Sequence, residues 1–140
     1  MAKKARDIMS TDVTSIGADT TVLDAATKMR DLDVGALPIC GEDNRLKGMI
    51  TDRDIVVHVL AEGKDPSTTK SGDVGEGDAN TVTIGADDSV DEALETMQRY
   101  QVRRLPVIDG QEMVGIIAQA DVARHLKEKA TGETVEAISK

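Results

Sequence analysis

Residues 16–39, IGADTTVLDAATKMRDLDVGALPI, return later in the chain as residues 84–107, IGADDSVDEALETMQRYQVRRLPV. The starting points 16 and 84 differ by 68, and ten of the 24 aligned positions are identical. After a loop that is one residue longer in the first copy, LKGMITDRDIVVH (46–58) aligns with MVGIIAQADVARH (113–125). Self-similarity over this length indicates that the chain consists of two copies of one structural unit.

The hydrophobic period changes along each copy. Apolar residues recur at helical spacing in residues 22–32 and 90–100, and Ser89 with Glu92 has the spacing of a capping box at a helix start. The segments GALPIC and RRLPVI read as short strands, each turning into a second strand and then a second helix. We therefore predict an α/β (α+β) fold of two pseudo-symmetric repeats, each ordered strand, helix, strand, strand, helix.

The stretch between the copies, EGKDPSTTKSGDVGEGDAN, is rich in Gly, Ser, Thr and Asp and poor in apolar residues, which is typical of a connection. The last residues, ATGETVEAISK, are polar, and we expect a loose or partner-docked end. The predicted organisation is a first repeat at 5–62, a linker at 63–72, a second repeat at 73–130 and a C-terminal tail at 131–140.

The composition limits the classes of function. The 140 residues carry 17 Lys and Arg against 26 Asp and Glu, for a formal charge of -9, and the only aromatic side chain is one Tyr. Nucleic-acid binders usually present basic surfaces or stacked rings, so we expect no nucleic-acid partner. No apolar run is long enough to span a membrane, and MAKKARDIMS lacks the apolar stretch of a signal peptide, so we expect a cytoplasmic protein.

The side chains with special chemistry are few. The single cysteine, Cys40, has no intrachain disulfide partner and is expected to be a buried small hydrophobe. His58 and His125 occupy equivalent places in the two copies, where a structural role is favoured and metal binding stays open as an alternative. One Cys and two His are too few for a four-ligand zinc site, so we expect no metal or other cofactor. Tyr100 replaces Leu32 of the first copy and is expected to fill the core.

The duplicated motifs resemble the cystathionine β-synthase (CBS) domain family, whose members pair two copies into a Bateman module. The likeness lies in DIM (7–9), in the LPI and LPV strands, and in GMITDRD (48–54), and it covers about residues 5–129. The resemblance implies that the cleft between the copies binds an adenosine compound such as AMP, ADP, ATP or S-adenosylmethionine. In the family the Asp of the last motif holds the ribose, and backbone of the early strand reads the adenine edge.

The chemistry of the motif agrees with that role. A carboxylate only accepts hydrogen bonds, so Asp54 can take both vicinal ribose hydroxyls, and Thr51 opens a helix whose amino end favours phosphate. The same two residues also form a good helix cap, so the capping interpretation stays open beside the ligand interpretation.

In the family, the Asp motif of one copy faces strands of the other, which implies two candidate sites. The residues of site one are Thr51, Asp54, Asn80, Thr81, Val82, Val102, Arg103 and Arg104. The weaker site two consists of Asp121 with Asp12, Val13, Thr14, Val34, Gly35 and Ala36. Site two has Ala118 in place of the hydroxyl and no cation, so we expect a phosphate to prefer site one. For Arg103 and Arg104 a solvated or oligomer-contact role stays open. Val82 and Val102 are expected to be core-facing wall residues.

The sequence shows no nucleophile and base pair, metal cluster or phosphate loop, so we expect no enzyme. We predict a regulatory, ligand-sensing protein that acts on an unknown protein partner, and the resemblance implies a homodimer formed through helices. The alternative is a ligand-free interaction module that acts in a stress response.

Overall fold

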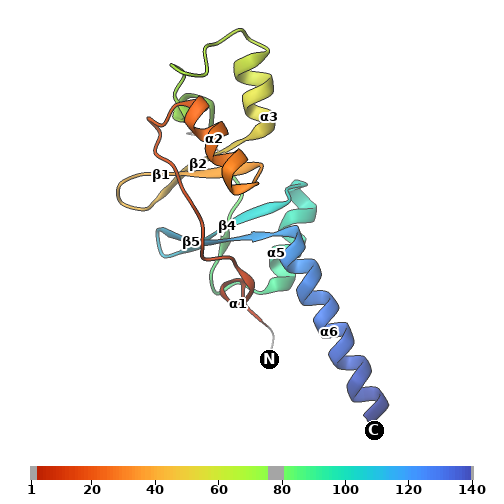
Figure 1. Cartoon of the computed structure of the whole chain (residues 1–140). Coiled ribbons are helices and arrows are strands. Elements are labelled where there is room, and N and C mark those ends of the chain that lie inside the picture. The colour runs from red at the N-terminus through yellow and green to blue at the C-terminus, as the bar shows by residue number, and fades with distance from the viewer. Residues whose placement is uncertain (1–2, 76–80, 140) are drawn as a thin grey trace. The chain divides into compact units, whose positions relative to one another are not determined.

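The computed structural model describes residues 3–75 and 81–139, with side chains described as far as residue 131 (Figure 1). The chain forms two compact units. The first-repeat unit is Thr14–Thr81, and the second-repeat unit combines Met1–Val13 with Val82–Lys140. Each unit is described by itself below.

The first-repeat unit is a helix and a β-hairpin followed by further helical turns. Its elements are α2 (Val22–Leu32), β1 (Ala36–Cys40), β2 (Leu46–Thr51), α3 (Asp52–Ile55), the π-helix η1 (Val56–Leu60) and α4 (Ser71–Gly75). The antiparallel register of β1 and β2 pairs Leu37 with Ile50. The predicted first strand of this copy is wrong as a strand. It is reduced to one parallel bridge between Ile16 and Ile39, because only Ile16 of this segment reaches the hairpin edge.

The second-repeat unit has the full predicted order. Its elements are α1 (Ala5–Ile8), β3 (Ile84–Gly85), α5 (Val90–Tyr100), β4 (Arg104–Asp109), β5 (Glu112–Ala118) and α6 (Gln119–Ser139). The sheet order is β3-β4-β5, with β3 parallel and β5 antiparallel to β4. The backbone of the predicted tail, as far as Ser139, continues α6.

Helices α2 and α5 begin where the sequence predicts. The Thr21 hydroxyl accepts the Asp24 N–H at 3.1 Å, and the Ser89 hydroxyl accepts the Glu92 N–H at 3.1 Å. Each bond satisfies a backbone donor that the first helical turn leaves without a partner. The two helices thereby present matched apolar faces: Val22, Ala25 and Met29 are buried in α2, and Val90, Ala93 and Met97 in α5.

Each unit buries its own aliphatic cluster, as the composition predicts. In the first-repeat unit, Ile39 and Ile50 are fully buried at the centre of the cluster. In the second-repeat unit, Leu105, Val107 and Ile117 are fully buried. The prediction that Tyr100 fills the core is wrong, because its side chain is 56% exposed. Tyr100 lies in the last turn of α5. The helical spacing predicts which way its side chain faces, but it does not predict whether another element packs against that turn.

Helix α1 precedes the first repeat in sequence but packs on the second. The Ala5 N–H donates to the Asp88 carbonyl at 2.8 Å, and the Arg6 N–H donates to the Ala86 carbonyl at 3.0 Å. The Arg6 guanidinium adds ion pairs to Asp87 at 2.9 Å and to Asp109 at 3.2 Å. This docking explains why residues 1–13 belong to the second-repeat unit.

Helix α4 makes the matching contact with the first repeat. The Ser71 N–H donates to the Thr20 carbonyl at 2.8 Å, and the Val22 N–H donates to the Thr69 carbonyl at 2.8 Å. Ser71 and Gly75 are buried. The segment predicted as a linker, 63–72, is therefore docked against the start of α2, and each repeat is completed by the short helix that precedes the other.

Candidate functional site

The turn from β2 into α3 places Thr51 and Asp54 in direct contact. The Thr51 hydroxyl accepts the Asp54 N–H at 3.0 Å, and one Asp54 carboxylate oxygen, Oδ2, accepts the Thr51 N–H at 3.0 Å. This reciprocal capping box confirms the capping interpretation. Within the part of the chain that the structure describes, Oδ1 of the half-buried Asp54 has no protein partner. The box therefore fixes the carboxylate and leaves one oxygen free to accept further hydrogen bonds.

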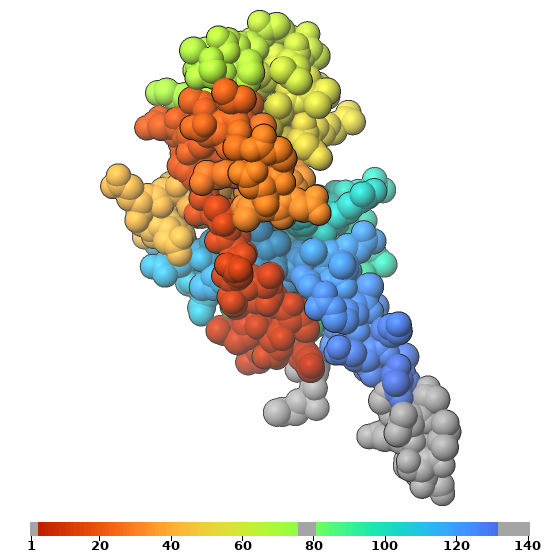
Figure 2. All heavy atoms as spheres, viewed as in Figure 1, coloured from red at the N-terminus to blue at the C-terminus, as the bar shows by residue number. Residues whose placement is uncertain are grey.

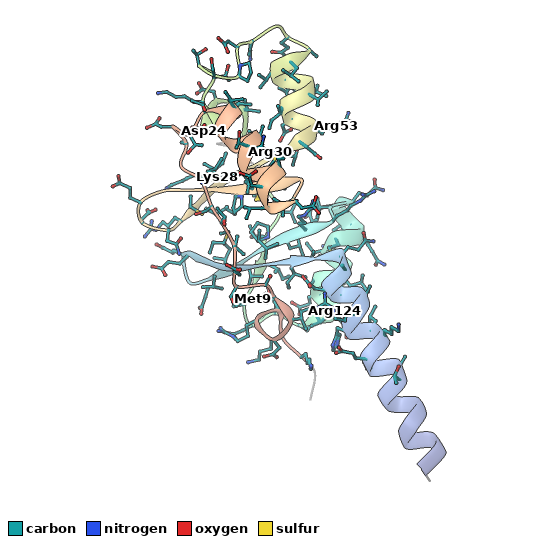
Figure 3. The ribbon with its side chains drawn as sticks, viewed as in Figure 1. Met9, Asp24, Lys28, Arg30, Arg53 and Arg124 are labelled. Atoms are coloured by element: carbon teal, nitrogen blue, oxygen red, sulfur yellow. The ribbon has the colours of Figure 1, made fainter. Side chains whose placement is uncertain are left out.

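The equivalent turn from β5 into α6 is arranged differently. Oδ2 of Asp121 accepts the Ala118 N–H at 2.8 Å, and Oδ1 accepts a hydrogen bond from Arg124 at 3.2 Å. Arg124 is the labelled side chain on α6 in Figure 3. The Asp121 side chain is 16% exposed. Both carboxylate oxygens of Asp121 already accept hydrogen bonds, and Ala118 has no hydroxyl group. This edge therefore has fewer groups available to bind a ligand than the edge at Asp54.

The strand that enters each hairpin lies beside the Asp motif of the same repeat. In the first-repeat unit, Ala36 pairs with Thr51, and the Gly35 carbonyl accepts the Asp52 N–H at 2.9 Å. A side chain at Gly35 would meet the Asp52 carboxylate at 3.1 Å. Sequence reasoning overlooked Asp52, although it stands next to Thr51 in the motif. Its carboxylate makes this edge acidic together with Asp54.

The second-repeat unit repeats this backbone pattern with opposite charge. Arg104 pairs with Ala118, and the Arg103 carbonyl accepts the Gln119 N–H at 2.8 Å. Both arginines are exposed, and within the described residues neither side chain forms a hydrogen bond or an ion pair. Gln119 stands where the first repeat has Asp52, so this edge is basic where the other is acidic.

The remaining predicted residues divide between the two units. Val82 and Val102 are partly buried against the core of the second-repeat unit, as expected for wall residues. Val13 and Thr81 are half-buried. In site two, the exposed residues are Asp12, Thr14 and Val34. Asn80 of site one lies outside the described residues. Each predicted site draws on both compact units, and its assembly remains a prediction.

The sequence profile of the CBS domain matches residues 5–61 and again residues 74–128. The chain belongs to the CBS domain family. Hypoxic response protein 1 of Mycobacterium tuberculosis strain H37Rv is 49% identical over 134 residues, which cover 96% of this chain and 92% of that protein. The CBS domain-containing protein YhcV of Bacillus subtilis is 34% identical over 135 residues, covering 96% of this chain and 94% of that protein.

Solved structures show the same CBS pair. The crystal structure of Hypoxic Response Protein I with two coordinated zinc ions has a TM-score of 0.80 and 48% identity, covering 88% of this chain and 98% of that one. The CBS domain pair of protein MJ0100, in complex with 5′-methylthioadenosine and S-adenosyl-L-methionine, has a TM-score of 0.78 and 25% identity. It covers 92% of this chain and 99% of that chain. These neighbours show that the mixed helix and strand fold is the CBS fold.

The two histidines and the cysteine lie on three different elements of the CBS repeats. His58 is exposed on η1, His125 is half-buried on α6, and Cys40 is buried on β1. Burial raises the pKa of the Cys40 thiol, although a hydrogen bond with Ser15 lowers it. Among the described residues, no three His, Cys, Asp or Glu side chains are placed to hold a metal ion. No described helix is long and apolar enough to cross a bilayer.

Proposed function

We propose that this CBS protein is a non-catalytic, cytoplasmic regulator that binds an adenosine compound between its two repeats. The ligand class is AMP, ADP, ATP or S-adenosylmethionine. The observation that carries the proposal is the Thr51–Asp54 capping box, which holds a carboxylate in place while Oδ1 accepts no hydrogen bond from the described residues. A carboxylate oxygen held in this way is a suitable acceptor for ribose hydroxyls. The MJ0100 neighbour, which binds two adenosine compounds, supports the same class.

Site one is the proposed primary site. Oδ1 of Asp54 accepts no hydrogen bond from the described residues, whereas both carboxylate oxygens of Asp121 accept hydrogen bonds from Ala118 and Arg124. Arg103 and Arg104 carry unpaired guanidinium groups within the described part of the chain, and such groups bind phosphate well. The proposed preference is therefore for a phosphorylated adenosine compound.

The test is titration calorimetry with AMP, ATP and S-adenosylmethionine on the wild type and on two matched variants. Asp54→Asn keeps an oxygen for the Thr51 N–H but turns an amide donor toward the ligand, so we expect about ten-fold weaker binding. Asp121→Asn is the control at the equivalent position and should retain most of the affinity. Silence with all three compounds at millimolar concentration would refute ligand binding, and equal losses in the two variants would refute the ranking.

The proposal does not include a metal ion, although one structural relative binds zinc. Hypoxic Response Protein I coordinates two zinc ions in its crystal structure. In the described part of this chain, the potential ligands do not come together in threes.

We also propose that the protein forms a homodimer through α3 and η1. Val56 and Leu60 are each 56% exposed and Val57 is 38% exposed on this helical segment. Apolar residues gathered on one surface helix favour burial against another protein surface. Sedimentation should show a dimer for the wild type and a monomer for Leu60→Glu, and a monomeric wild type would refute the dimer.

The second candidate function is a ligand-free interaction module of a stress response. It is favoured by the relative named Hypoxic response protein 1. It predicts that partner proteins recovered with the wild type are also recovered with Asp54→Asn. Loss of those partners in that variant would favour the ligand-sensing function instead.

A further inference from the structure

The second-repeat unit contains a cavity of about 550 Å³ that uses none of the residues of the proposed adenosine sites. Its walls come from the N-terminal segment, from the start of α5 and from α6. The polar lining residues are Lys3, Ser89, Asp91, His125, Glu128 and Lys129. The volume lies within the range of roughly 300–1,000 Å³ that is usual for small-molecule sites.

The walls of this cavity are fixed by backbone and helix geometry. The Val90 N–H donates to the Lys3 carbonyl at 3.1 Å, and Lys4 forms an antiparallel bridge with Ser89. Val90 is 3% exposed, so α5 contributes a buried apolar residue beside the polar lining. On α6, residues 125, 128 and 129 follow the i, i+3, i+4 spacing and share one helix face. Figure 2 shows α1, which follows Lys3, side by side with α6.

The charged groups of the cavity have no partner among the side chains that the structure describes. Lys3 and Lys129 bring ammonium groups, and Asp91 and Glu128 bring carboxylates. Within the described residues, none of these four side chains forms a hydrogen bond or an ion pair. A cavity that holds both signs of charge without internal pairing leaves both available to a ligand. Elsewhere in the same unit, oppositely charged side chains do pair with each other, as Arg124 and Asp121 do at 3.2 Å.

We propose that this cavity binds a small zwitterionic molecule that carries a phosphate or carboxylate group together with an ammonium group. The anionic group contacts Lys3 and Lys129. The ammonium group contacts Asp91 and Glu128. A ligand with only one sign of charge would bring that charge beside two lining groups of the same sign. A metal ion alone does not fit, because no three described ligand side chains are placed to hold one.

The two histidines of the chain provide a probe and its internal control. His125 lines the cavity, whereas His58 holds the equivalent position in the first repeat and is exposed on η1. The experiment follows the imidazole proton resonances by NMR during titration with O-phosphoethanolamine. Inorganic phosphate and ethanolamine serve as probes with a single sign of charge. We expect the His125 resonances to shift with half-saturation at about 1 mM O-phosphoethanolamine while those of His58 stay in place. Each of the other probes should bind about ten-fold more weakly.

Charge variants on α6 test the assignment of the contacts. Lys129→Gln and Glu128→Gln should each weaken O-phosphoethanolamine binding about ten-fold. Lys127→Gln changes an exposed residue of the same helix outside the lining and should have no effect. Asp54→Asn should also leave this binding unchanged, which separates the cavity from the proposed adenosine site.

Three results would overturn the proposal. The first is a His125 signal that does not move up to about 20 mM O-phosphoethanolamine, or moves together with that of His58. The second is binding of inorganic phosphate as tight as that of O-phosphoethanolamine, which would indicate a plain anion site. The third is an equal loss in Lys127→Gln, which would indicate unspecific attraction by the helix surface.

Discussion

Replacing Ser71 with alanine is expected to stabilise the protein. Ser71 is fully buried in α4, and within the described residues its hydroxyl oxygen has no hydrogen-bond partner. Its backbone N–H is satisfied by the Thr20 carbonyl at 2.8 Å, so the substitution leaves the docking of α4 intact. The second-repeat unit shows that alanine fits this place, because Ala5 is fully buried at the equivalent position and donates to the Asp88 carbonyl at 2.8 Å.

The magnitude follows from the cost of burying an unpaired hydroxyl, which is about 1–3 kcal/mol in proteins. Removing one oxygen atom also loses a few van der Waals contacts. Ser71→Ala should therefore raise the free energy of unfolding by about 1 kcal/mol, which corresponds to about 3 °C in the melting temperature for a chain of this size.

Urea unfolding followed by circular dichroism measures the effect as a higher midpoint with an unchanged slope. The reciprocal variant Ala5→Ser places an unpaired hydroxyl in the second-repeat unit and should lower the free energy of unfolding by about 1–3 kcal/mol. The reasoning is refuted if Ser71→Ala unfolds at a lower urea concentration than the wild type, because the hydroxyl would then have a stabilising partner.

Three further predictions concern packing, pH and reactivity. Gly75→Ala should lower the free energy of unfolding by about 2 kcal/mol, because the new Cβ would collide with a backbone carbonyl of β2. The control is Gly17→Ala, whose Cβ would have no described atom within 4 Å. In the same urea assay it should change the free energy of unfolding by less than about 0.5 kcal/mol. The hydrogen bond from Arg6 lowers the pKa of Asp87, so this carboxylate stabilises the fold above the pKa that it has when unfolded, and the contribution is lost as the pH falls through the lower folded value. Unfolding curves between neutral and acidic pH should therefore be less pH-dependent in Asp87→Asn, and identical profiles would contradict the role of the pair. Burial raises the pKa of Cys40, so iodoacetamide should alkylate the native thiol more slowly than the urea-unfolded thiol, and equal rates would show that the thiol is accessible.

Much of the candidate site was predictable because it is local in sequence. The Thr51–Asp54 box spans three residues, and the side chains reach each other as soon as the helix begins. The engagement of Asp121 by Arg124 is also local, at i and i+3, although the motif alone did not draw attention to it. The place of Asp52 is not predictable from the motif alone, because the hairpin brings this carboxylate beside Gly35, a residue 17 positions earlier (52 − 35).

The sequence by itself determined the duplication, the starts of α2 and α5 and the aliphatic character of both cores. These follow from repeated motifs, capping residues and hydrophobic spacing, all of which act over a few residues. Only the tertiary structure decided that α1 packs on the second repeat and α4 on the first, that Tyr100 is exposed, and that Lys3 lies beside the start of α5 to form a cavity with α6. Such pairings join segments about 50 residues or more apart, as Ser71 and Thr20 do. They depend on which surfaces can bury one another, which local patterns do not specify.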